Sequence, residues 1–188
     1  KHLLLGFSFL VLSASLIAQE TENTGIEEII VTARQQDESL QDVPVTVSVL
    51  SEVDLDRNNI TNLTDAAKMV PNFRINPGGS GNGSNIYLRG IGSSSISAAF
   101  DQSVAINIDG VVVNRGRFIH NAYLDMAQIE VLKGPQSLYF GKSATAGVIS
   151  IKTNDPTDEF EAEFGVGVET EHETTFFEGV ISGPISDN

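Results

Sequence analysis

The sequence predicts a small domain of short strands and short helices, followed by the first strands of a transmembrane β-barrel. Between residues 43 and 154, short apolar runs alternate with turn residues, and some apolar residues recur at helical spacing. From Ala162 to Thr170, apolar residues alternate with glutamate and glycine, which is typical of strands that face lipid on one side and water on the other. We therefore expect two structured regions, 43–154 and 155–188.

Composition narrows the possible functions. The 188 residues include 11 Lys and Arg against 25 Asp and Glu, for a formal net charge of −14. This balance argues against nucleic acid as a partner, because binding a phosphate backbone requires clustered basic residues. The absence of cysteine excludes thiolate metal sites, thiol catalysis and disulfides, and the three histidines are far apart in sequence. We expect no metal site and no cofactor.

No catalytic set is visible in the sequence. The acidic residues form no spaced pair on one element that would support general acid–base chemistry, and no serine lies in a G-x-S-x-G motif. We therefore expect no catalytic residues and no enzyme activity. The alternative is an exported enzyme that assembles its site from distant residues.

Residues 1–18 have the pattern of a secretory signal peptide. Lys1 is followed by an uncharged run, Leu3–Ala18, that ends in small side chains. The run is short for a membrane-spanning helix, which needs about 20 residues. We expect cleavage after Ala18, or alternatively after Ser15, and hence export; a buried core helix is the alternative to a signal peptide.

Residues 19–42 predict a flexible, acidic segment that contains one β-prone run, Ile29–Ala33. An extended apolar run in a flexible segment suits strand addition to the sheet edge of another protein. The alternative is that this run forms the first strand of the domain that follows. Both can hold at different stages of a functional cycle.

The sequence over residues 45–70 predicts one strand and two helices. Alternating valines over residues 45–49 predict a strand with one buried face. Ser51, followed three residues later by an aspartate, predicts a capped helix over residues 52–57. Apolar residues at helical spacing over 63–70 predict a second helix, which Pro71 ends.

The next part predicts loops and strands in alternation. Residues 76–84 and 93–99 are rich in glycine, serine and other small residues, and they predict loops. A strand over residues 86–88 lies between them. Asp109-Gly110, flanked by alternating apolar residues, predicts a β-hairpin. A brief helix is expected over residues 122–126.

Residues 128–153 predict a strand, a tight turn, one helical turn, a glycine-rich bend and a second strand. Gly134 and Pro135 end the first strand, because proline has no N–H for a ladder and glycine adopts backbone angles that other residues avoid. Gly141 ends the helical turn. In the second strand, Ile149 and Ile151 alternate with polar residues.

Residues 155–188 are interpreted as the first strands of an outer-membrane β-barrel. A linker over residues 153–157 precedes the first of these strands, and a charged turn over residues 171–173 precedes a second apolar run, 174–185. We expect the sequence to be the N-terminal part of a longer chain.

The segment at residues 128–153 resembles the end of the plug domain in TonB-dependent outer-membrane receptors. That family reads roughly (V/I)EVL(R/K)GPQ, then a tyrosine and a glycine, and then G-x-I-x-I. The matching residues here are Ile129–Gln136, Tyr139, Gly141 and 146–151.

The resemblance extends over roughly residues 27–186. Residues 42–73, DVPVTVSVLS…LTDAAKMVPNF, are similar to the opening of the plug, and Leu88–Gly90 match its L-R-G element. The resemblance implies an α+β plug domain at 43–154, a mixed four-stranded sheet with short helices, inside a large closed barrel of about 22 strands.

The resemblance also implies functional residues. A TonB box at 29–33, within the flexible segment 19–42, implies these TonB-binding residues: Glu28, Ile29, Ile30, Val31, Thr32 and Ala33. Contacts between plug and barrel would involve Arg89, Lys133 and Gly134, although an ordinary solvated arginine is the alternative for Arg89. The ligand-facing loops would contain Gly81, Asn82, Ser94, Ser95, Arg115 and Arg117.

By this resemblance, the expected function is energised uptake of a scarce solute through the outer membrane of a Gram-negative bacterium. The expected partners are the periplasmic domain of TonB, outer-membrane lipid and a small-molecule ligand, for which a ferric siderophore is the first expectation. A carbohydrate, vitamin or aromatic compound is an alternative ligand. A plug-like binding or signalling module without transport is the alternative function.

Overall fold

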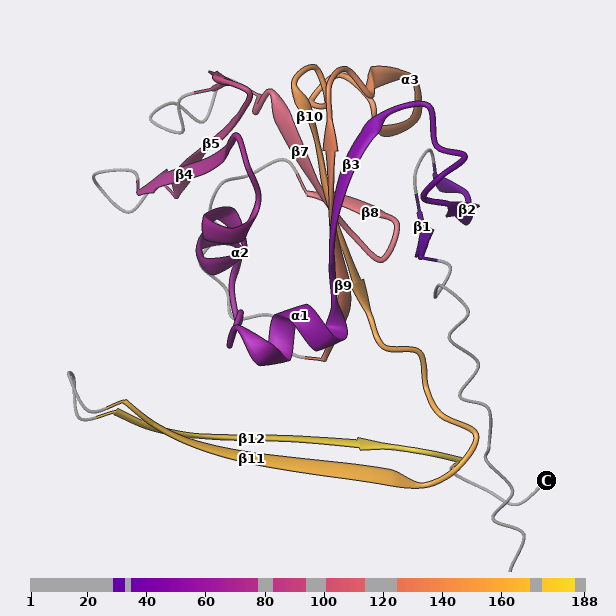
Figure 1. Ribbon diagram of the computed structural model, residues 1–188, viewed down its shortest axis with the longest axis vertical. Coiled ribbons are helices and arrows are strands. Elements are labelled where there is room, and N and C mark those ends of the chain that lie inside the picture. Colours follow the sequence, from indigo (N-terminus) through magenta and orange to yellow (C-terminus); the bar gives the residue numbers. More distant parts are fainter. Residues whose placement is uncertain are drawn as a thin grey trace, which may run out of the picture.

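The computed structural model describes residues 29–32, 35–77, 83–93, 101–113, 125–169 and 174–184. Figure 1 shows a central sheet with helices and a small sheet on one side, a short strand pair on the other, and a separate two-stranded hairpin. The expected signal peptide lies outside the described residues. Of the helix expected over residues 122–126, only Asp125 and Met126 are described, and Met126 begins a strand.

The central sheet is mixed, as expected, and has five strands. Its order is β3 (Thr46–Ser51), β9 (Met126–Lys133), β10 (Gly147–Thr153), β7 (Val104–Ile108) and β8 (Val111–Val113). The pair β10–β7 is parallel and the other pairs are antiparallel. The sheet has one strand more than the four implied by the resemblance, because the three-residue strand β8 pairs with the edge of β7.

One face of this sheet is covered by two helices and a three-stranded sheet (Figure 1). The covering elements are α1 (Glu52–Arg57), α2 (Leu63–Met69), β4 (Phe73–Pro77), β5 (Ser84–Leu88) and β6 (Ile91–Gly92). A continuous apolar core fills the interface and includes fully buried side chains from the sheet and from its cover, among them Ile129, Ile149, Leu63, Ile86 and Leu88.

Capping residues determine where both helices begin, as predicted for α1. Before α1, the Ser51 hydroxyl accepts the Asp54 N–H at 3.3 Å, while the Asp54 carboxylate accepts the Ser51 N–H at 3.1 Å. Before α2, the Asn62 side-chain oxygen accepts two backbone N–H groups at 2.9 and 3.0 Å. Helix α2 ends at Met69 because Val70, the residue before Pro71, adopts extended angles.

The opposite face of the sheet is covered by the segment that precedes the domain. This segment contains β1 (Ile30–Val31) and β2 (Glu38–Ser39), which pair antiparallel with each other. A second, smaller apolar cluster joins it to the sheet. The described part of the segment, expected to be flexible, therefore lies packed on the domain in this structure.

Residues 128–153 form the predicted sequence of elements. Strand β9 is followed by a turn at Gly134 (φ +116°), by the helical turn α3 (Ser137–Phe140) and by Gly141 (φ +79°). The hairpin at Asp109-Gly110 is also confirmed, with Ile108 opposite Val111. Strand β10 differs from the expected alternation: its first five residues are all buried, because both faces of the sheet are covered.

The two C-terminal strands, β11 (Glu161–Glu169) and β12 (Thr174–Ser182), form an antiparallel hairpin. Their register brings Val166 opposite Phe177 and Ala162 opposite Ile181, so apolar side chains gather on one face. That face is exposed: Phe164, Val166 and Phe177 are 73, 68 and 77% accessible. In the part of the chain that the structure describes, no helix has the length and apolar character required to cross a bilayer.

We expect Gly147→Ala to destabilise the protein more than Gly110→Ala. Both glycines have positive φ, +153° and +85°, so an alanine costs about 1–3 kcal/mol at either position. At Gly147 an added Cβ would also lie 2.3 Å from the Leu132 carbonyl oxygen, whereas at Gly110 it would meet open space. Overpacking adds about 1–3 kcal/mol for Gly147→Ala, which urea unfolding measures. Equal losses for the two variants would contradict this packing.

Candidate functional site

The β-prone run Ile29–Thr32 lies on the second face of the central sheet. Val31 is fully buried and belongs to an apolar cluster that includes Leu132 and Val148 of the sheet. Burying a valine side chain stabilises by about 1.5–3 kcal/mol. Ile29 and Ile30, by contrast, are 43 and 45% exposed. The run is therefore held by one apolar side chain, and the remaining contacts are polar.

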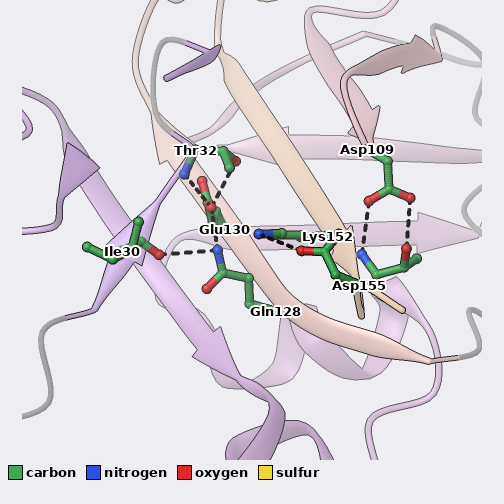
Figure 2. Close-up of polar contacts among 8 residues, drawn as sticks. Ile30, Thr32, Asp109, Gln128, Glu130, Lys152 and Asp155 are labelled. Atoms are coloured by element: carbon green, nitrogen blue, oxygen red, sulfur yellow. Dashed lines mark hydrogen bonds and ion pairs between the residues drawn. The ribbon is translucent and has the colours of Figure 1, made fainter. Parts of the chain in front are cut away.

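The strongest polar contact joins Thr32 to Glu130 of β9 (Figure 2). The Glu130 Oε1 atom accepts the Thr32 backbone N–H at 2.7 Å and the Thr32 hydroxyl at 2.9 Å. The same oxygen accepts the Gln128 side-chain amide at 2.8 Å. Hydrogen bonds to an ionised acceptor are stronger than neutral ones. One carboxylate oxygen thus holds both the backbone and the side chain of Thr32.

Gln128 makes a second contact with the run. Its Nε2 atom donates to the Ile30 carbonyl oxygen at 3.3 Å, as Figure 2 shows. Gln128 and Glu130 are two residues apart on β9, so their side chains lie on the same face of the sheet. Successive residues of this face therefore supply a donor and an acceptor to the run.

Glu130 belongs to a row of polar side chains across three strands. The register places Glu130 opposite Ser150 of β10, and Ser150 opposite Asn107 of β7. The Asn107 amide donates to the Ser150 hydroxyl at 3.0 Å, and that hydroxyl lies 3.3 Å from the hydroxyl of Thr32. Glu130, Ser150 and Asn107 are at most 4% exposed. The buried face under the run is thus polar at its centre.

Burial dominates the electrostatics of this row. Removal of the Glu130 carboxyl from water raises its pKa, the Thr32 and Gln128 hydrogen bonds act in the opposite direction, and the nearby charge of Asp37 adds to the rise. The second carboxylate oxygen, Oε2, is buried and has no partner among the described residues. Keeping a buried carboxylate ionised costs free energy. This desolvation of Glu130 offsets part of the stabilisation that its hydrogen bonds with Thr32 provide.

The three residues expected to contact a barrel lie near one another at another part of the domain. Lys133 is 8% exposed, and its ammonium donates to the Ser48 hydroxyl at 2.8 Å. Burial lowers the pKa of Lys133, and the positive charge of Arg89 lowers it further. Gly134 follows directly and donates its N–H to the Ala146 carbonyl at 3.0 Å. Within the described residues, neither cation forms an ion pair.

Arg89 has an unusual backbone. It is exposed and occupies the left-handed region, with φ +51°, in the turn between β5 and β6. An L-residue other than Asn, Asp or Gly pays about 1–2 kcal/mol for this conformation. The turn alone therefore does not explain why an arginine is present there.

Several expected site residues lie outside the described residues. These are Glu28 and Ala33 of the TonB-binding set, and all six of the ligand-facing set: Gly81, Asn82, Ser94, Ser95, Arg115 and Arg117. The described members of the first set, Ile29–Thr32, are brought together with two residues that the sequence did not single out, Gln128 and Glu130. Glu130 is a charged residue inside the apolar run Ile129–Leu132. That feature of the sequence could have indicated a buried polar contact on this strand.

No group of three or more histidine, aspartate or glutamate side chains within the described ranges is arranged to hold a metal ion. Shallow depressions on either side of the run, of about 460 and 640 Å³, are lined by mixed polar and apolar residues.

A profile of the TonB-dependent receptor plug domain matches residues 39–148. Among curated proteins, the iron-regulated outer membrane virulence protein of Vibrio cholerae is 29% identical over 192 aligned residues, which cover 95% of this chain and 28% of that protein. The vitamin B12 transporter BtuB of Vibrio vulnificus is 31% identical over 145 residues, or 73% of this chain and 22% of that protein. This chain thus spans about a quarter of the length of these relatives.

Solved structures of similar proteins show the same fold. The ferric yersiniabactin uptake receptor FyuA from Yersinia pestis superposes with a TM-score of 0.69 and 29% identity, over 76% of this chain and 22% of that one. The pyoverdine outer membrane receptor FpvA from Pseudomonas aeruginosa has a TM-score of 0.69 and 19% identity, over 89% of this chain and 24% of that one.

We expect the stability difference between the wild type and Glu130→Gln to fall as pH rises. The carboxyl pKa is raised in the folded state above its ordinary value of 4.5, so below that pH its contribution is fully present. As pH rises through the folded pKa, the unfolded chain releases this proton more readily and the contribution is lost. Glutamine keeps an acceptor oxygen but does not titrate.

Urea unfolding of both proteins from pH 4 to pH 8 measures this difference, in which the titration of all other groups cancels. A difference that grew with pH would contradict the prediction, because it would mean that the hydrogen bonds to Glu130 outweigh its burial.

Proposed function

Because this chain belongs to the TonB-dependent receptor plug domain family, we propose that it supplies the plug and first barrel strands of an outer-membrane receptor that takes up a scarce solute with energy delivered through TonB. The observation that carries this proposal is the attachment of the run Ile29–Thr32 to the plug by one apolar side chain and a few hydrogen bonds. Such an attachment is reversible, as a signalling strand requires.

In this proposal the TonB-binding residues are Glu28, Ile29, Ile30, Val31, Thr32 and Ala33. When ligand binds outside, the run leaves the sheet and pairs as an added strand with the periplasmic domain of TonB. Force transmitted through that strand then moves or partly unfolds the plug. In the described state the run lies against the domain as part of the pair β1–β2, and in this proposal the docked run and the TonB-paired run are two stages of one cycle.

A ferric siderophore is the proposed solute. This is supported by the name of a similar structure, the ferric yersiniabactin uptake receptor, and by the iron-regulated relative from Vibrio cholerae. Similarity to vitamin B12 transporters supports a vitamin as the second candidate. The proposed ligand contacts are in the loops that contain Gly81, Asn82, Ser94, Ser95, Arg115 and Arg117.

We further propose that Arg89, Lys133 and Gly134 form the contact between plug and barrel. Two neighbouring cations without an acidic partner among the described residues favour a carboxylate from elsewhere, and the open space at Gly134 allows close approach of another backbone. The exposed apolar face of β11 and β12 supports lipid as the surroundings of these strands. Residues 1–18 would direct export to the outer membrane.

We expect a synthetic peptide spanning residues 20–41 to bind the periplasmic domain of TonB, and Val31→Pro and Thr32→Pro peptides to lose most of that affinity. Proline has no N–H for the ladder and holds φ near −65°, which disfavours central strand positions. Val31→Ala keeps the N–H and serves as the control, with binding within a few-fold of the native peptide. Calorimetric titration measures each affinity. If the native peptide does not bind, or all four peptides bind equally, the TonB-binding assignment is wrong.

We expect Val166→Lys to impair membrane assembly of the protein more than Glu163→Lys. Val166 belongs to the exposed apolar face, and a lysine on a lipid-facing strand costs about 2–4 kcal/mol near the bilayer centre. Glu163 lies on the other face of the same strand, where a charge is already present. Heat-modifiable migration of the protein in outer membranes reports assembly. Equal assembly of both variants would count against a lipid-facing role for this face.

A further inference from the structure

The strand β1 has two edges, and the structure shows what occupies each. Toward β2, the Ile29 carbonyl accepts the Leu40 N–H at 2.9 Å, and Val31 lies opposite Glu38. Backbone groups of successive residues in a strand point to opposite edges. The N–H and C=O groups of Ile30 and the N–H of Thr32 therefore point to the edge away from β2, whereas the Thr32 carbonyl accepts the Gln35 N–H at 3.2 Å.

On that second edge the partners are side chains. The Ile30 carbonyl accepts the Gln128 amide, and the Thr32 N–H donates to the Glu130 carboxylate. Among the described strands, β1 pairs with β2 alone. Gln128 and Glu130, a donor and an acceptor two residues apart on β9, thus match the Ile30 carbonyl and the Thr32 N–H, which are two residues apart in the run Ile29–Thr32. An added β-strand would present the same alternation of donor and acceptor.

The two side chains are not needed to build the sheet that carries them. Strand β9 is central and pairs through its backbone with β3 on one side and β10 on the other. An apolar side chain at position 130 would avoid the cost of burying a carboxylate whose second oxygen has no described partner. The favourable contribution of Glu130 is therefore its hydrogen bonding to Thr32.

We propose that Gln128 and Glu130 take the place of a partner strand on the second edge of β1, so that docking of the run on the plug and strand addition by TonB exclude each other. Glu130 is the positioning residue: it sets how much of the time the Thr32 N–H is available when no ligand is bound. The identity of the added strand rests on the proposed function above, whereas the occupation of the edge does not.

The first test is hydrogen exchange at the Thr32 amide in the ligand-free protein. In Glu130→Leu, which keeps volume but removes the acceptor, we expect exchange at Thr32 to accelerate roughly ten-fold or more, since an unsatisfied buried N–H corresponds to about that change in equilibrium. Glu130→Gln keeps an acceptor oxygen and should preserve most of the protection. Amides in the centres of β9 and β10 report global unfolding and should not accelerate.

Ile149→Val is the matched control, because it removes one buried methylene from the opposite face of the sheet and leaves the run untouched. In Ile149→Val, hydrogen exchange at the Thr32 amide should accelerate no more than exchange at the amides of β10. Unchanged protection of Thr32 in Glu130→Leu, or equal acceleration in Ile149→Val, would overturn the proposal. If Glu130→Leu loses protection throughout β9 and β10 as well, its effect is global and the proposal fails.

The second test is binding of the TonB periplasmic domain to the ligand-free protein. Glu130→Leu and Gln128→Leu should bind several-fold more tightly than the wild type, Glu130→Leu by the larger factor, while Glu130→Gln should stay near the wild type. None of these variants alters the run itself. If the peptide of residues 20–41 binds TonB but the variants bind like the wild type, the edge proposal is wrong and the proposed function stands.

If the peptide itself does not bind, the proposed function is wrong, and the exchange experiment still decides whether Glu130 holds the edge. Tighter binding by Ile149→Val to the same extent would also contradict the proposal, because it would trace the effect to general loosening of the plug.

Discussion

The buried carboxylate of Glu130 is the constraint on which the second face of the central sheet depends. A carboxylate that is 1% exposed must find hydrogen-bond donors, and the donors come from Thr32 and Gln128. Thr32 belongs to the segment before the domain. The hydrogen bonds that the Glu130 carboxylate requires therefore position a segment almost a hundred residues earlier in the chain. Ser150 and Asn107 continue the same polar row and lie under the same cover.

The two faces of the sheet consequently differ in what holds their cover. Toward α1 and α2, large apolar side chains from sheet and cover interlock in one continuous core, which is lost only when the domain unfolds. Toward β1, a smaller apolar cluster that includes Val31 and Val43 joins the cover to the sheet, and hydrogen bonds to Gln128 and Glu130 hold the run over a polar centre. Exposing a polar surface to water costs less than exposing an apolar one. Exposure of the second face to water is therefore less unfavourable than exposure of the first.

Two features of Arg89 and Lys133 are unfavourable within the described residues. Burial and the positive charge of Arg89 both lower the pKa of Lys133, and no described carboxylate forms an ion pair with either cation. The left-handed backbone of Arg89 adds a local cost. The similar chains of known structure are longer, and this chain matches about a fifth to a quarter of each.

Local features of the fold were predictable from sequence because each depends on neighbouring residues. The capping box at Ser51, the end of α2 before Pro71, the turn at Asp109-Gly110 and the alternation in β11 all follow from patterns that span a few positions. The number of strands in the central sheet and the burial of both faces of β10 did not follow, because they depend on which strands lie side by side. The sequence by itself determined the elements, the family and the presence of a β-prone run at Ile29–Thr32. Only the tertiary structure decided that Glu130 and Gln128 hold that run, because a contact between residues 98 positions apart leaves no periodic trace in the chain.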